Sequence, residues 1–178
     1  MAVLEVIKMG HPTLRQVARE LTPEEITSDA TAELIEDMRD TLHAQGGIGL
    51  AAPQVNQPIR LAVIEMESGT SRYGDFEAHG FSVYINPVLR PQPCAEAGYW
   101  EGCLSIPGMR GYVERPQHLI VDYLDTAGRA HTIEVEGFLA TVFQHEIDHL
   151  DGTLYIDRLK DTRLLAFDDE YTQFIEED

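Results

Sequence analysis

Residues 137–152 read GFLATVFQHEIDHLDG, and this stretch decides how the rest of the chain has to be arranged. It is apolar on most sides apart from its histidine and acidic positions, which is typical of a buried helix. Gly152 is placed to end that helix. Two histidines and a glutamate are costly to bury without partners. We therefore expect a central helix with the remaining elements packed around it.

The polar residues of this helix, His145, Glu146 and His149, follow the pattern His-Glu-x-x-His. Residues four apart lie one turn apart on the same helix face, so both imidazoles can bind one metal ion. Glu146, next to the first histidine, can then reach water bound to the metal, as in metal-dependent hydrolases. Five-residue matches also arise by chance, but the apolar setting favours a metal site.

The third metal ligand has more than one candidate, because a catalytic metal usually has three protein ligands and one open position. Tyr155 stands where a metzincin protease has its third histidine, so that pattern fails. Asp169 or Glu170 would suit a thermolysin-type zinc endopeptidase, although both lie in a strongly charged tail. Cys103 is the other candidate, and without a metal it would be a small buried hydrophobic residue. A non-catalytic metal-binding module is a further alternative.

The rest of the chain predicts strands and a second long helix. That helix runs from about Ser28 to Gln45, while the polar segment Glu67–Gly80 is expected to be a surface loop. Short apolar segments predict strands at Ile59–Glu65, Phe81–Asn86, Leu119–Leu124 and Thr132–Glu136. Several strands with two main helices and no regular βαβ alternation indicate an α+β fold, with antiparallel or mixed sheets around the central helix.

Composition narrows the class of protein. A length of 178 residues fits a single domain covering residues 1–178, and no apolar run approaches the ~20 residues that span a bilayer. The net charge of −18 argues against DNA as a partner and against an anionic membrane surface. Only Cys94 and Cys103 are cysteines, so a disulfide framework is not expected. We expect a soluble cytoplasmic protein without a signal peptide.

Three segments, in this order and at similar spacing, resemble the signature motifs of bacterial-type peptide deformylases. They are GIGLAAPQ at 47–54, EGCLS at 101–105 and QHEIDHLDG at 144–152. His11–Arg15 and Ile106–Arg115 also resemble the family, so the likeness covers roughly residues 4 to 160. It implies an enzyme that hydrolyses the N-formyl group from the N-terminal methionine of nascent polypeptides and releases formate.

The resemblance also implies a catalytic site. Cys103, His145 and His149 would bind one divalent ion, usually Fe²⁺ in this family, with Zn²⁺, Ni²⁺ or Co²⁺ able to replace it. Glu146 would move the proton during hydrolysis. The Gln54 side chain and the Leu104 backbone N–H would donate to the formyl oxygen. Without the resemblance, Gln54 would be interpreted as an ordinary polar loop residue.

Further positions match the substrate groove of the family. They are Ile48, Gly49 and Gly102 for the extended peptide backbone, Phe138 and Val142 for the methionine pocket, and Glu101 with Arg110 as an ion pair near the site. Two segments depart from better-known members. Ser68–Gly80 is expected to be an added loop, and the tail at 168–178 holds six acids and no base. Ribosome contact stays open, but not through a basic tail.

Overall fold

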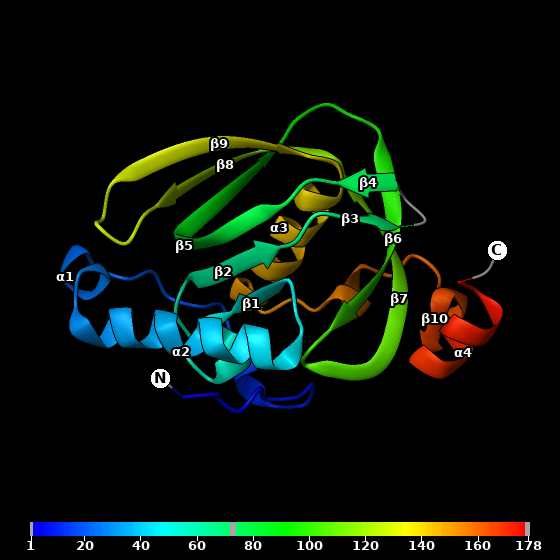
Figure 1. The fold of residues 1–178 in the computed structure, drawn as a ribbon, viewed down its shortest axis with the longest axis horizontal. Helices are drawn as coiled ribbons and strands as arrows, with labels where there is room; N and C mark the ends of the chain where they lie inside the picture. Colours follow the sequence, from blue (N-terminus) through cyan, green and yellow to red (C-terminus); the bar gives the residue numbers. More distant parts are fainter. Residues whose placement is uncertain (1, 72–73, 177–178) are drawn as a thin grey trace.

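The structure is a computed structural model that describes residues 2–71 and 74–176. Helix α3 (Gly137–Leu150) lies in the middle of the molecule, as the sequence predicts (Figure 1). Gly152 follows its last turn with a φ of +70°, a conformation that favours glycine. A Cβ atom at Gly152 would lie 2.8 Å from the carbonyl carbon of Arg15, so only glycine fits here.

A five-stranded antiparallel sheet curves over α3 (Figure 1). Its strand order is β1 (Gly49–Ala51), β2 (Leu61–Met66), β5 (His79–Pro91), β8 (His118–Leu124) and β9 (Ala130–Glu136). Ile64, Tyr84 and Val121 pack on one face of the sheet with Phe143 and Ile147 of α3. All four expected strands are found in this sheet, with bounds that shift by a few residues.

The second long helix, α2 (Asp29–Gln45), covers the other face of the same sheet. The Ser28 side chain accepts a hydrogen bond from the Thr31 N–H and caps the helix. Buried Met38 and Leu42 of α2 belong to a cluster that includes Leu61 and other strand residues. Because β2 is buried on both faces, it reads as a continuous apolar run rather than an alternating one. A shorter helix, α1 (Pro23–Ile26), precedes α2.

A second, three-stranded sheet lies beside α3, with the order β10 (Leu165–Phe167), β7 (Ile106–Pro116) and β6 (Glu96–Cys103). Neither β6 nor β7 is among the strands expected from sequence, because glycines interrupt β6 and both glycines and prolines interrupt β7. They nevertheless pair continuously from Glu96 opposite Pro116 to Gly102 opposite Arg110. Both β6 and β1 are edge strands, so each has one side free of a strand partner.

The segment expected to be a surface loop contains strands in its described residues. Within Ser68–Gly80, β3 (Gly69–Ser71) pairs with β4 (Gly74–Phe76), and β5 begins at His79. Residues 72 and 73 of this segment lie outside the described residues. The loop prediction was therefore wrong for most of the segment. Strand β5 also continues through Pro87, because a register shift between Ile85 and Val88 leaves the proline outside the pairing.

The acidic tail begins with a short helix, α4 (Asp168–Phe174), at the end of β10. Four 3₁₀ turns complete the described elements: Pro12–Arg15, Ala52–Val55, Tyr155–Arg158 and Thr162–Leu164. Tyr171 of α4 is buried, whereas Asp169 and Glu170 are exposed. None of the helices in the described residues has the length and apolar composition to cross a lipid bilayer.

Candidate active site

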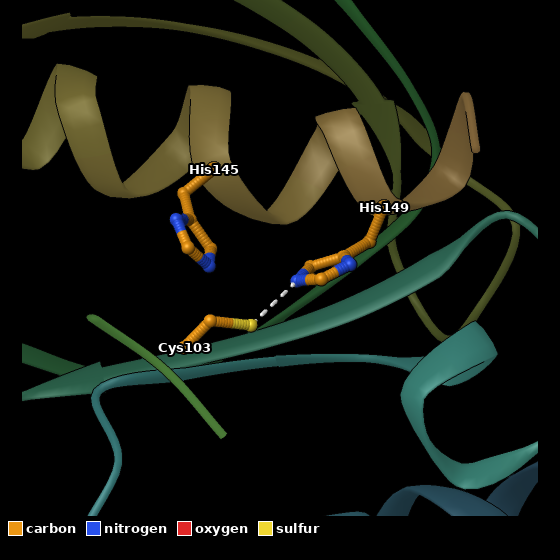
Figure 2. Close-up of side chains that lie close together, drawn as sticks. All are labelled: Cys103, His145 and His149. Carbon is orange, nitrogen blue, oxygen red and sulfur yellow. Dashed lines mark hydrogen bonds between the residues drawn. The ribbon is translucent and has the colours of Figure 1, made fainter. Parts of the chain in front are cut away.

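Three residues with metal-binding atoms meet between α3 and β6. His145 and His149 extend from successive turns of α3 towards Cys103, the last residue of β6 (Figure 2). The Cys103 Sγ lies 3.3 Å from Nε2 of His149. One ligand atom from each of the three residues lies within 4.8 Å of the other two. A thiolate and two imidazoles in this arrangement can bind a single first-row divalent metal.

A chain of linked ion pairs holds the first histidine. His145 Nδ1 contacts Glu101 at 2.8 Å, which leaves the other ring nitrogen for a metal. Arg115 donates to both oxygens of Glu101, at 2.6 and 3.1 Å, and to Asp148 at 2.8 Å. Asp148 also accepts from Arg158, at 2.6 Å. Burial alone would raise the pKa of Glu101, but the bonds with His145 and Arg115 outweigh burial and lower it.

The structure corrects the ion pair expected between Glu101 and Arg110. Glu101 lies opposite Gly111 in the β6–β7 ladder, so Arg110, one residue earlier, faces the other side of the sheet. Arg115 lies four residues beyond Gly111 and shares the face of Glu101. Arg110 instead pairs with Asp168, with 3.0 Å between Nε and Oδ1. The partner of Glu101 is therefore Arg115.

Glu146 is buried beside Cys103, His145 and His149, with 5% of its surface exposed. Its Oε2 atom has no hydrogen-bond partner among the described residues, and neither has Nδ1 of His149. Burial raises the pKa of Glu146 to about 7 and lowers that of His149 well below its usual value. A neutral imidazole is the form that binds a metal, and an unpartnered carboxylate suits contact with water or substrate. The residues present therefore fit a metal site with water.

The orientation of Gln54 is fixed by its neighbours. The Ala51 N–H donates to Oε1 of Gln54 at 2.8 Å. The amide Nε2 therefore points the other way, 3.3 Å from Ser105 Oγ and 3.6 Å from Cys103 Sγ. Gln54 is 2% exposed, so packing and hydrogen bonds together hold its N–H groups towards Cys103.

A cavity of about 580 Å³ opens over these residues. Of the site residues expected from sequence, all but His149 line it, and His149 is buried with 1% of its surface exposed. The lining includes Ile48, Gly49, Gln54, Glu101, Gly102, Cys103, Leu104, Arg110, Phe138, Val142, His145 and Glu146. Asp169 and Glu170, the alternative third ligands, are exposed on α4 and outside this cavity.

Sequence reasoning missed several residues that shape the site. Arg115 holds Glu101 and through it His145, Asp148 accepts from Arg115, and Ser105 accepts from Gln54. Trp100 and Asp168 also line the cavity. The strand alternation of β7 could have identified Arg115, but only if β7 had been recognised as a strand.

Comparisons with known proteins identify the family. Residues 3–164 match the family described as polypeptide deformylase. The peptide deformylase of Leptospira biflexa is 41% identical over 170 residues, covering 96% of this chain and 95% of that protein. Peptide deformylase 1 of Nitrosomonas europaea is 43% identical over 164 residues, covering 92% of each.

A solved structure supports the same family assignment. The Met-Ala-Ser-bound class I type b peptide deformylase of Acinetobacter baumannii has a TM-score of 0.81 and 32% identity to this chain. The match covers 89% of this chain and 99% of the other. Such values establish the α+β fold as well as the family. The chain therefore belongs to the polypeptide deformylase family, the metal-dependent hydrolases that remove the N-formyl group from nascent polypeptides.

Proposed function

We propose that Cys103, His145 and His149 bind one divalent ion, Fe²⁺ in the cell, and that Glu146 is the general base and acid of deformylation. The proposal rests on one observation. One thiol and two imidazoles lie close together beside the buried carboxyl group of Glu146, whose Oε2 has no hydrogen-bond partner among the described residues. When bound, such an ion supplies Lewis-acid chemistry by lowering the pKa of a water molecule from ~15.7 towards neutrality.

Glu146 accepts a proton from water as the water oxygen attacks the formyl carbon. It then gives a proton to the leaving amine, so the C–N bond breaks and the products are formate and a free N-terminus. Burial supports this role, because a pKa of about 7 lets the carboxyl group both accept and return a proton near neutral pH. The close approach of Gly49 leaves the carboxylate little freedom to move.

Negative charge develops on the formyl oxygen during attack, and two donors of this chain stabilise it. We assign them to the Gln54 amide and the Leu104 backbone N–H. The fixed orientation of Gln54 supports this role, since a donor that needs no rearrangement contributes most in the transition state. Losing one such donor typically costs on the order of 10²–10³ in rate.

The peptide is proposed to bind as an extended strand between two edge strands, along Ile48–Gly49 on one side and Gly102 on the other. Phe138 and Val142 receive the methionine side chain. Both are apolar and line the cavity, and the A. baumannii relative is described with Met-Ala-Ser bound. The substrates are N-formylmethionyl peptides of nascent chains, and we expect the enzyme to meet them in the cytoplasm.

The test is formate release from formyl-Met-Ala-Ser under anaerobic conditions, with the bound metal measured in the same sample. We expect turnover by iron-loaded protein, loss with a chelator, and recovery when Fe²⁺ is added back. Zinc-loaded protein should be slower but stable in air, since ferrous iron beside a thiolate is sensitive to oxygen. No formate release by iron-loaded, folded protein would refute the proposal. Turnover that is equal with and without metal would do the same.

A further inference from the structure

We propose that the C-terminal helix α4 forms the distal wall of the peptide groove and helps to select the third residue of the substrate, counting formylmethionine as the first. Tyr171 acts as a positioning residue behind Trp100, and Asp168 controls the charge of Arg110. The inference rests on the proposed path of the peptide along β6. It concerns which peptides are preferred, whereas the proposed function concerns the hydrolysis itself.

The path of the peptide follows from the two edge strands. The formyl group lies at Cys103, so a peptide added to β6 leaves the metal-binding residues past Gly102 and continues towards Trp100. Residues rise about 3.3 Å each in an extended chain, so two residues cover the same length in peptide and strand. The third substrate residue therefore lies beside Trp100, which shares the strand face of Gly102 and lines the cavity.

Helix α4 supports this end of the cavity from behind. The rings of Trp100 and Tyr171 have centroids 5.1 Å apart, and Tyr171 is 5% exposed. Arg110 lies opposite Gly102 in the β6–β7 ladder, and its Cζ is 5.5 Å from the centre of the Tyr171 ring. One aromatic side chain of α4 thus contacts both Trp100 and Arg110, two residues that line this part of the cavity.

Asp168 adds a charge effect to the same region. It lines the cavity and pairs with Arg110, and both side chains are a little under half exposed. Because its charge is engaged by Asp168, Arg110 is a poor partner for an acidic third residue. We infer that the enzyme does not favour glutamate over lysine at this position. Removing the Asp168 charge should shift the preference towards glutamate.

The aromatic part of the proposal is tested with two amidated peptides, formyl-Met-Ala and formyl-Met-Ala-Ser. Tyr171→Ala should lower kcat/KM for the tripeptide about five- to tenfold, mainly through KM, and for the dipeptide less than about twofold. Tyr171→Phe keeps the ring and should restore the tripeptide value. Phe174→Ala is the matched control, because Phe174 lies on the same helix but is 63% exposed.

The charge part uses amidated formyl-Met-Ala-Glu and formyl-Met-Ala-Lys. Asp168→Asn should raise the Glu-to-Lys ratio of kcat/KM about two- to fivefold at low salt, and high salt should reduce the change. This variant is isosteric, so it also serves if Tyr171→Ala does not fold. Equal losses on the di- and tripeptide, or an unchanged Glu-to-Lys ratio, would overturn the inference. Absence of formate from every peptide, parent protein included, would instead refute the proposed function.

Discussion

Replacing Arg115 by methionine tests how the protein holds its metal-binding histidine. Methionine keeps most of the apolar stem of the side chain and removes the guanidinium group. Arg115 is 4% exposed on its side chain, and its partners Glu101 and Asp148 are 5% and 9% exposed. The substitution therefore leaves two carboxylates in the protein interior without the cation that lies between them.

The expected cost follows from the contacts that remain. Removing one partner of a buried ion pair typically costs 3–5 kcal/mol. Glu101 keeps its contact with His145, and Asp148 keeps Arg158, so we expect the lower end, about 3 kcal/mol. For a chain of this length, that corresponds to a fall in Tm of roughly 6–12 °C. Metal affinity should fall about 10- to 100-fold, since Glu101 orients the His145 ring.

Two measurements separate stability from metal binding. Thermal unfolding is followed on chelated protein, because a bound ion stabilises the folded state by an amount that depends on its concentration. Affinity is then measured by titrating Co²⁺, whose thiolate absorption reports binding at Cys103. Arg110→Met is the matched control, since Arg110 is 42% exposed and pairs with Asp168 on the other face of β7. It should cost less than about 1 kcal/mol and leave Co²⁺ affinity unchanged.

Two outcomes would contradict this prediction. An Arg115→Met protein that melts within about 2 °C of the parent and binds Co²⁺ equally well would show that the buried ion pairs do not hold His145. A larger loss from Arg110→Met than from Arg115→Met would show that the ion pair at this site had been assigned to the wrong arginine.

Three further predictions concern the chemistry. A Cβ atom at Gly49 would lie 2.4 Å from Oε1 of Glu146, so Gly49→Ala should displace the carboxylate and lower kcat at least about tenfold with metal retained. Gly80→Ala, which meets nothing within 4 Å, is its control, and equal activity of the two variants would contradict the prediction. Glu146→Ala should keep its metal, measured by elemental analysis, while the rate of formate release falls about 10²–10⁴-fold. Unimpaired turnover would remove Glu146 from the mechanism. Cys103→Ala should abolish metal binding in the same analysis while Glu170→Ala does not, and the reverse would favour a thermolysin-type site.

Much of the fold could be predicted from sequence, because most of its helices and strands are indicated by patterns within short segments. The buried helix α3 and the amphipathic helix α2 follow from apolar periodicity with Gly152 and Ser28 at their ends. Four strands of the large sheet, β2, β5, β8 and β9, follow from short apolar runs. Strands β6 and β7 gave no such signal, because their glycines and prolines read as turns. Their pairing with each other, and the docking of β10 and α4 on β7, are long-range properties that no window of sequence contains.

For the site, the residues could be identified from sequence, but not all of the contacts between them. Resemblance to a family identified the residues that the structure gathers around one cavity. It did not identify which arginine contacts Glu101, because Arg110 and Arg115 are only five residues apart and lie on opposite faces of β7. Strand register decides between them, and register requires the strand to be known. Asp148 went unnoticed for a related reason, since its role depends on Arg115.

Charge balance links the fold to the proposed metal. The centre contains three carboxyl groups and the Cys103 thiol, together with two guanidinium groups. These groups belong to Glu101, Glu146, Asp148, Arg115 and Arg158. A divalent ion supplies the two positive charges that are still lacking when the thiol and the carboxyl groups are ionised. Without the ion, burial favours the protonated form of Glu146 and raises its pKa to about 7. Metal binding should therefore stabilise the folded protein and release protons, which makes its affinity rise with pH.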